Sequence, residues 1–469
     1  MEPVHVAPVD AGYLSMDASN TTGNVTLVLS LAGDLTLPAL RAHVQDRLPL
    51  LPELRRVLHE VAWGMDRPWW VDDSSFDLGQ HLAEHRLPNA RGREADDAID
   101  GHIPDAVREA AARVLMTPLD RSRPLWRLDL VRAGRTGSRR AFLCVTIHHA
   151  MADGTQFLHV LRTLFDAHSH PAPQGDTWVA TPAPADAELL RRSAAESIDW
   201  IWRNTVAAAG SIAGTVGHQA WQNLVTASTQ SAPVTPFNKT LSADRAWGVA
   251  SVSIAASQAV RRRLGVTLND LLHAMVAEAL RDWMLARRAL PAAPLVVLVP
   301  KVAAGTGPDP AALNRIEMGV STLPTHVSDP VARLKTIHSA MRQAKDAPLF
   351  TETVMDLAAR MSSASTSPLT RYAADLAVQF RVMDYVPTGT NLVISNVSMG
   401  TDRYEIAGVE VTHVHPLSPL SNGQGMFVTT QGYRGHLDMG VTSCPALMPD
   451  VQEVVDAMVG CYDRLCALG

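Results

Sequence analysis

Cysteine is scarce in this chain of 469 residues. Cys144, Cys444, Cys461 and Cys466 are too few and too scattered for a disulfide framework, and no CxxC pair indicates a metal site. We therefore expect a protein of a reducing compartment, without a bound metal and without a cofactor of its own.

Long apolar runs and concentrated basic segments are also absent from the sequence. No stretch of about eighteen apolar residues occurs, which argues against a transmembrane helix. The first residues, Met1-Glu2-Pro3-Val4-His5, lack the basic and apolar regions of a secretory signal. A net charge of −6 without a Lys/Arg block offers no surface for nucleic acid phosphates. These absences predict a cytoplasmic protein that does not bind nucleic acid.

The composition is that of a folded globular protein, with 46% hydrophobic and 19% charged residues. A chain of this length exceeds the size of a single hydrophobic core, so two domains are expected. Turn-rich, proline-containing segments at 171–184 and 231–236 punctuate the sequence. We predict an N-terminal lobe over 1–180, a helical linker over 181–235 and a C-terminal lobe over 236–469.

Strand and helix patterns alternate in both halves, which predicts an α/β fold. Residues 24–31 and 295–299 read as strands, and residues 106–115 read as a helix. The stretch 188–226 has a helical apolar pattern that could bridge the two lobes.

The segment with the clearest chemistry is His148-His149-Ala150-Met151-Ala152-Asp153-Gly154. The apolar, β-branched run 141–147 precedes it and predicts a buried strand that ends at the two histidines. Gly154 permits a tight turn, after which apolar residues recur at helical spacing. His148, His149 and Asp153 are therefore expected on a strand-to-helix loop held by rigid elements.

His149 is predicted to be a general base. A neutral imidazole, with a pKa of about 6.5, can take a proton from a hydroxyl as its oxygen attacks a carbonyl carbon. Asp153 is placed to orient a ring or to hold the loop through an arginine. Because a thioester already carries a good leaving group, attack by an alcohol needs no covalent acyl-enzyme. We predict that His149, His148 and Asp153 form the catalytic group.

Other interpretations of the paired histidines remain open. Two histidines at the end of a strand can be structural. A metal site is disfavoured, since no third ligand stands at recognisable spacing. The four fixed positions of HHxxxDG should coincide by chance in roughly one of several hundred such sequences, which favours the catalytic interpretation.

With these residues in hand, the chain resembles the bacterial wax ester synthase/diacylglycerol acyltransferase family, a branch of the CoA-dependent acyltransferase superfamily. The resemblance runs nearly end to end and rests on several ordered motifs. Beside HHxxxDG these are Val9-Asp10-Ala11-Gly12-Tyr13-Leu14, Trp70-Val71-Asp72-Asp73, Phe76-Asp77-Leu78, Pro124-Leu125-Trp126, Asn269-Asp270-Leu271-Leu272-His273, Ala279-Leu280-Arg281 and Ile394-Ser395-Asn396-Val397.

The resemblance implies two chloramphenicol-acetyltransferase-like α/β lobes with an active-site tunnel between them. It also implies transfer of a fatty acyl group from acyl-CoA to a fatty alcohol or diacylglycerol, giving wax ester or triacylglycerol. Substrate-binding residues are predicted at Gly154, Asn269, Asp270, Ser395 and Asn396. Asn269 or Asp270 could instead cap a helix, and Ser395 and Asn396 could be turn residues.

The sequence departs from the family pattern at three places. Ser398-Met399 stands where Pro-Gly is usual, Leu313 replaces a glycine, and Gly432 replaces a serine. These departures leave the predicted base intact and put the substrate preference in question. Nonribosomal peptide condensation domains share HHxxxDG but normally lie beside carrier modules, which this sequence lacks.

Two further expectations concern partners and rival functions. Because wax esters and triacylglycerols are insoluble, peripheral contact with the inner membrane or with lipid droplets is expected, and the helical stretch 188–226 with Trp200, Trp202 and Trp221 is one candidate surface. The rival functions are a non-catalytic lipid- or acyl-CoA-binding scaffold of the same fold, or an acyltransferase with another alcohol or amine acceptor.

Overall fold

The structure is a computed structural model of the chain. It describes residues 2–61, 66–87, 101–133, 141–152, 154–165, 178–196, 198, 232–302, 316–346, 375–399 and 403–468.

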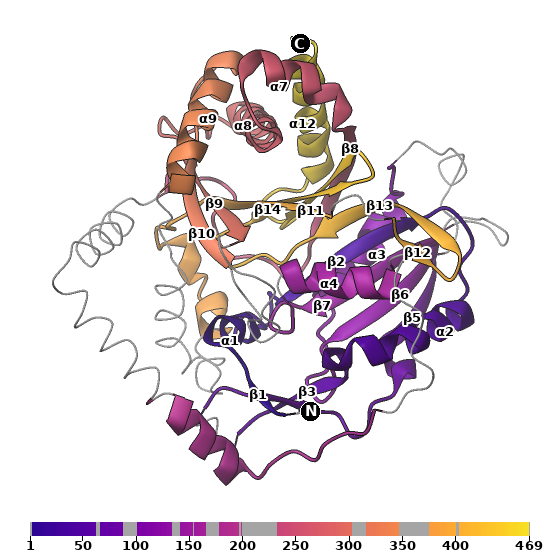
Figure 1. The fold of residues 1–469 in the computed structure, drawn as a ribbon. Helices are drawn as coiled ribbons and strands as arrows, with labels where there is room; N and C mark the ends of the chain where they lie inside the picture. Colours follow the sequence, from indigo (N-terminus) through magenta and orange to yellow (C-terminus); the bar gives the residue numbers. More distant parts are fainter. Residues whose placement is uncertain are drawn as a thin grey trace.

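The first lobe is built on a six-stranded sheet with the order β12-β13-β2-β7-β6-β5 (Figure 1). Helices α2 and α4 pack on one face of this sheet, and α3 packs on the other. The elements are β2 (Asn24–Leu31), α2 (Leu37–Arg47), β5 (Leu82–Leu87), α3 (Asp105–Met116), β6 (Trp126–Ala133), β7 (Ala141–His148), α4 (Gly154–Phe165), β12 (Glu405–Ile406) and β13 (Val409–Leu417).

Strand β7 lies inside this sheet between β2 and β6. All eight of its residues are buried, because helices cover both faces of the sheet at this point. A strand covered on both faces reads as a continuous apolar run rather than as an alternation. That is why the segment before the paired histidines was recognisable in the sequence.

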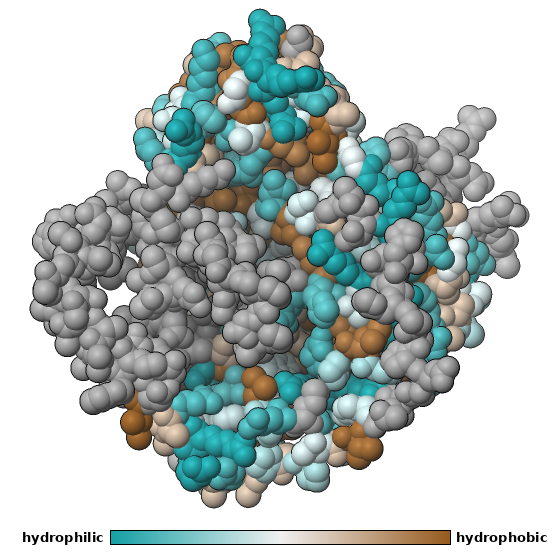
Figure 2. Space-filling model, viewed as in Figure 1, coloured by the Kyte–Doolittle hydropathy of each residue, from teal (hydrophilic) through white to brown (hydrophobic). Residues whose placement is uncertain are grey.

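The second lobe contains another six-stranded sheet, with the order β10-β9-β11-β14-β15-β8. Its helices α8, α9 and α12 lie together on one face (Figure 1) and share a hydrophobic core with the strands. Hydrophilic residues gather on the outer surface at the top of this lobe (Figure 2). The elements are β8 (Ala246–Ser253), α7 (Gln258–Leu264), α8 (Leu268–Ala286), β9 (Leu295–Val302), β10 (Ile316–Leu323), α9 (Pro330–Asp346), β11 (Leu392–Ser398), β14 (Met426–Tyr433), β15 (His436–Ser443) and α12 (Val451–Cys466).

A small three-stranded sheet, β1-β4-β3, completes the N-terminal part. Helix α1 (Pro8–Leu14) follows β1 (Val4–His5) and leads the chain toward the larger sheet, while β3 (Arg56–His59) and β4 (Trp69–Asp72) form the rest of the small sheet.

The two large sheets meet where β13 crosses from the second half of the chain into the first sheet and pairs with β2. The Asp438 carboxylate on β15 accepts hydrogen bonds from the Val414 backbone N–H at 2.8 Å and from His413 Nδ1 at 2.9 Å. A β-carbon added at Gly440 would lie 1.7 Å from the Pro416 carbonyl oxygen, so only glycine allows this approach. We call this contact between β13 and β15 the interlobe joint.

The predicted α/β class with two sheet-containing lobes is confirmed. The strands expected at 24–31 and 295–299 and the helix expected at 106–115 are present as β2, β9 and α3. The domain boundaries at 180 and 235 stay predictions, because most of the predicted linker lies outside the described residues.

The predicted helical stretch 188–226 is described only as far as residue 198, and residues 188–196 are helical. Trp200, Trp202 and Trp221 lie outside the described residues. Among the helices that the structure describes, none is both long and apolar enough to span a bilayer.

Candidate active site

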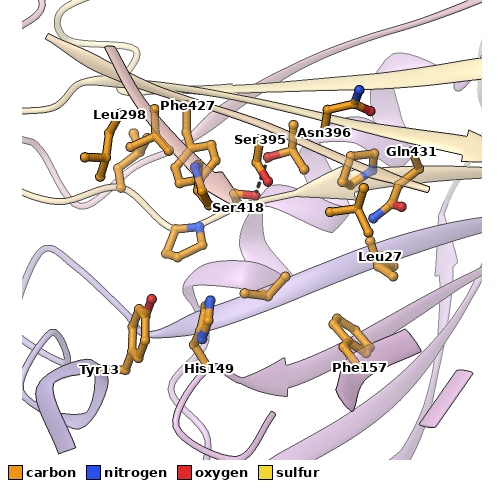
Figure 3. Close-up of a pocket in the computed structure, with 18 of the residues that line it drawn as sticks. Tyr13, Leu27, His149, Phe157, Leu298, Ser395, Asn396, Ser418, Phe427 and Gln431 are labelled. Atoms are coloured by element: carbon orange, nitrogen blue, oxygen red, sulfur yellow. Dashed lines mark hydrogen bonds between the residues drawn. The ribbon is translucent and has the colours of Figure 1, made fainter. Parts of the chain in front are cut away.

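A cavity of about 530 Å³ lies between the two lobes (Figure 3). Its walls are mostly apolar, and both sheets contribute to them. The first lobe supplies Tyr13, Met16, Val25, Leu27, His149, Ala152, Phe157, Leu158 and Leu161. The second lobe supplies Leu298, Pro300, Val393, Ser395, Asn396, Val397, Ser398, Met426, Phe427, Thr429 and Gln431. The end of β13 and the loop after it supply Pro416, Ser418, Pro419, Leu420, Ser421 and Gln424.

His149 stands directly after β7 and lines the cavity. Its backbone N–H donates to the Gly23 carbonyl at 2.8 Å, and its ring stacks on Tyr13 with centroids 3.8 Å apart and planes 10° apart. Burial lowers the pKa of His149 to about 4, against the smaller opposing effect of its own backbone carbonyl. The ring is therefore neutral at physiological pH.

His148 points away from the cavity into a buried hydrogen-bond network. Its Nδ1 accepts from the Ala150 backbone N–H at 3.1 Å, so Nε2 carries the proton and donates to Asp17 Oδ1 at 3.3 Å. Asp17 also accepts from the Gly23 N–H at 2.9 Å and from the Arg121 guanidinium at 3.0 Å. These bonds fix the orientation of the loop that carries His149.

The Asp17 carboxylate is held in its charged form. Burial by itself would raise the pKa of Asp17, but the hydrogen bond from His148, the Gly23 N–H and the Arg121 charge together hold it well below its ordinary value. A permanent negative charge therefore faces His148 at the base of the site.

Gly23 allows His148 to take this place. A β-carbon added at Gly23 would lie 2.5 Å from Nε2 of His148 and 2.8 Å from the Tyr13 carbonyl oxygen. Since real β-carbons do not come so close to other heavy atoms, any larger residue here must displace the imidazole or the backbone of α1.

Asp153 lies outside the described residues, and so does any arginine contact that it makes. Gly154 begins α4, and nothing of its surroundings is described. The catalytic role of Asp153 and the binding role of Gly154 stay predictions.

Ser395 and Asn396 both lie within β11, so the alternative that they form a turn is wrong. Ser395 lies on the cavity wall across from His149 (Figure 3). The Asn396 side chain points away from the centre of the cavity in the same view, and its Oδ1 accepts from the Thr430 hydroxyl at 3.0 Å. Ser395 is therefore the better placed of the two to contact a ligand.

Asp270 caps the N-terminus of α8. Its side chain accepts from the Thr267 N–H at 2.7 Å, its own N–H donates to the Thr267 hydroxyl, and His338 lies 2.8 Å from its carboxylate. The capping alternative is confirmed for Asp270. Neither Asn269 nor Asp270 lines the cavity, and their binding role stays a prediction.

Two of the departures from the family pattern adjoin each other in space. Ser398 on β11 is in register with Gly432 on β14, and the Met399 N–H donates to the Gly432 carbonyl at 3.1 Å. Met399 is fully buried, whereas Ser398 lines the cavity. Leu313, the third departure, lies outside the described residues.

Sequence reasoning missed several residues that the structure brings to the site. Tyr13 was noticed as part of a motif but not as the partner of His149, and Asp17, Gly23, Arg121 and Gln431 carried no motif. In the described part of the chain, no three His, Cys, Asp or Glu side chains gather in a way that could hold a metal ion.

A two-lobed fold with a histidine of HHxxxDG in the interlobe cavity is the arrangement expected of the CoA-dependent acyltransferase superfamily. The chain matches the model of the wax ester synthase/diacylglycerol acyltransferase catalytic domain over residues 6–272 and that of the family's C-terminal domain over residues 313–465. The chain therefore belongs to the wax ester synthase/diacylglycerol acyltransferase family.

Known proteins agree with this assignment. A putative diacylglycerol O-acyltransferase of Mycobacterium tuberculosis is 28% identical over 461 residues, which cover 96% of this chain and 87% of the relative. The solved wax ester synthase/diacylglycerol acyltransferase from Marinobacter aquaeolei superposes with a TM-score of 0.65 at 20% identity, over 98% of each chain.

The same fold occurs in the starter condensation domain of rhizomide synthetase, with a TM-score of 0.55 at 12% identity over 99% of this chain and 93% of that one. At such low identities the two solved structures show the fold alone. The family assignment makes this chain an acyl-CoA-dependent acyltransferase.

Proposed function

We propose that this enzyme transfers a fatty acyl group from acyl-CoA to the hydroxyl of a fatty alcohol or a diacylglycerol, with His149 as the general base. The observation that carries the proposal is a neutral imidazole in the wall of an apolar cavity of about 530 Å³, a size typical of ligand pockets. Membership of the family and the name of the M. tuberculosis relative support the same substrates.

In the proposed mechanism, His149 takes the proton of the acceptor hydroxyl while its oxygen forms a bond to the thioester carbonyl carbon. Nδ1 of His149 is enclosed, so Nε2 is the nitrogen that receives this proton. The tetrahedral intermediate then breaks its C–S bond, and the CoA thiolate leaves with the proton returned by His149. The products are the ester and free CoA thiol.

The remaining residues have supporting roles in this proposal. Tyr13 and the buried hydrogen bonds of His148 hold the His149 ring in one orientation. The entropy lost in positioning the base is therefore lost on folding and not in the reaction. The Ser395 hydroxyl, on the facing wall, is the proposed donor to the oxyanion.

The test replaces His149 by alanine. Purified wild-type protein given palmitoyl-CoA with hexadecanol or dioleoylglycerol should release CoA thiol, and His149→Ala should lower kcat by about a hundredfold or more, the usual contribution of a positioned base. Circular dichroism should show the same fold for both proteins. Binding of acyl-CoA without thiol release by the wild type would instead favour the non-catalytic scaffold.

We also propose that the enzyme works at a lipid surface. Phe380 and Tyr385, at either side of the short helix η8 (Val382–Asp384), are 68% and 84% exposed. A β-carbon at Gly423 would touch Met383 of η8, and the neighbouring Gln424 lines the cavity, so this apolar surface lies beside the cavity wall.

Flotation with vesicles of a bacterial phospholipid mixture tests this surface. Phe380→Ser combined with Tyr385→Ser should reduce the bound fraction of protein several-fold, because each exposed aromatic contributes to interfacial binding in proportion to its buried apolar area. Equal flotation of the variant and the wild type would remove residues 380–385 from the lipid contact.

A further inference from the structure

One polar group in the cavity has no role in the mechanism above. Gln431 stands on β14, where Phe427, Thr429 and Gln431 share the face that lines the cavity. The parallel neighbour β11 presents Val393, Ser395 and Val397 in register with them. The part of the wall that β11 and β14 form therefore consists of three pairs of side chains in register, and Gln431 belongs to the last pair.

The Gln431 amide lacks a hydrogen-bond partner within the described part of the chain. The residue is 5% exposed, and its Oε1 atom is enclosed without a bond. The adjacent pair differs in this respect, because the Thr429 hydroxyl forms a hydrogen bond with the Ser418 hydroxyl at 2.7 Å. Gln431 is thus a buried amide, aimed at the cavity, whose hydrogen-bonding capacity is unused (Figure 3).

An enclosed amide that makes no hydrogen bond raises the free energy of the protein. A buried polar group without a partner is destabilising, so binding of a hydrocarbon chain against Gln431 is penalised. Leu27 and Phe157 on the facing wall are apolar and offer the amide no bond. A polar group on a bound substrate would complete this site.

The substrate group must also be a second polar group. In the proposed function, the thioester and the attacking hydroxyl are both engaged at His149, and a plain fatty alcohol carries nothing else that is polar. A diacylglycerol carries two ester carbonyls besides its hydroxyl. Gln431 lines the cavity, and its amide carries N–H donors on Nε2, one of which can donate to such a carbonyl.

We infer that Gln431 hydrogen-bonds an ester carbonyl of a partial glyceride, and that it makes diacylglycerol rather than a plain long-chain alcohol the preferred acceptor. This inference rests on the proposed function and specifies its acceptor. The amides of the CoA arm also carry carbonyls, and the experiment below separates the two ligands by varying the acceptor. A site that supplies a hydrogen bond discriminates strongly against a substrate that lacks the matching group.

The experiment compares dioleoylglycerol with its dioleyl ether analogue, which keeps the hydroxyl and both chains but lacks the carbonyls. With palmitoyl-CoA as donor, the wild type should prefer the diester in kcat/KM by about tenfold, the factor that corresponds to one hydrogen bond to a buried amide. Gln431→Met, which has a similar length and no amide, should bring that ratio close to one and raise the relative rate with hexadecanol.

A matched variant controls for changes of cavity shape. Leu27→Met alters the facing wall without altering its polarity, so it should change the rates with diester and diether by the same factor and leave their ratio intact. Gln431→Met should melt at the same or a higher temperature than the wild type, because it removes an unsatisfied buried group.

Three results would overturn the inference: no preference for the diester in the wild type, a preference that survives in Gln431→Met, or a KM for palmitoyl-CoA that rises equally with every acceptor. The last result would assign the amide to the CoA arm. If the wild type turns over no acceptor, the proposed function fails by itself. Equilibrium binding of the diester and the diether to wild type and Gln431→Met then still decides whether Gln431 recognises the carbonyl.

Discussion

Two polar groups beside the cavity, His148 behind the first-lobe wall and Gln431 on the second-lobe wall, are bonded in opposite ways. On the first-lobe wall, His149 is supported from behind by a closed network in which His148 and Asp17 each have described partners. On the second-lobe wall, the enclosed Oε1 of Gln431 has no hydrogen bond within the described residues. A hydrogen-bond network whose members are all satisfied holds a side chain in one place, whereas an unsatisfied polar group can bind a ligand. The first wall is therefore suited to catalysis and the second to substrate recognition.

Gly23 gives the sharpest way to disturb the first wall alone. Gly23→Ala puts a β-carbon 2.5 Å from Nε2 of His148, so the His148–Asp17 bond must break and the turn that carries His149 must move. We expect kcat to fall by about ten- to a hundredfold, because displacement of a base by about 1 Å has effects of that size. Initial rates of thiol release with both acceptors measure it.

The matched control is Gly12→Ala in α1, where an added β-carbon meets nothing within 4 Å. Alanine in place of glycine should keep or slightly raise helix stability, and the rate should stay that of the wild type. Equal rates for Gly23→Ala and the wild type would show that the His148 network does not position His149.

A smaller effect is expected from pH, and it concerns His149 directly. The base acts when neutral, and burial lowers the pKa of His149 to about 4, so kcat/KM of the wild type should hold from neutral pH down to about pH 5 and decline as the pH passes through about 4. A rate profile over this range measures the limb. A decline centred near pH 6.5, the value of an exposed imidazole, would contradict the enclosed ring.

Acid also affects the stability of the fold, and the sign can be worked out. The folded-state pKa values of His149 and His415 both lie at about 4, below the ordinary value, so between pH 6.5 and 4 the unfolded chain binds more protons than the folded one. The contribution of these two histidines to the free energy of unfolding is therefore largest above pH 6.5 and falls toward pH 4. Rates at low pH need circular dichroism at the same pH as a control.

Much of the first wall could be predicted from the sequence. The apolar run before the histidines predicted β7, and the spacing of HHxxxDG placed His149 at its end, because a strand covered on both faces leaves a local signal. The network behind it had no such signal. Asp17 and Gly23 precede β7 by more than a hundred positions in the sequence, and only the pairing of β2 with β7 brings them to His148.

The second wall was predicted less well for the same reason. Ser395 was noticed because it stands in a motif, but its position on the cavity face follows from the strand register, which puts Ser395 beside Thr429. Gln431 is one polar residue among several in β14, and only the tertiary structure shows that it is buried and that its Oε1 has no partner in the part of the chain that the structure describes. Burial without a partner is a property of surroundings that lie far away in the sequence.

The interlobe joint has a consequence for the folding of the protein during its synthesis. Strand β2 is paired on one edge by β13, which is synthesised almost four hundred residues later. Until that strand emerges from the ribosome, the nascent first sheet ends in an unpaired apolar edge of the kind that invites aggregation. Because β13 also contacts β15, pairing of this edge and formation of the cavity between the lobes become a single event. An incompletely synthesised chain therefore has neither the paired edge nor the cavity.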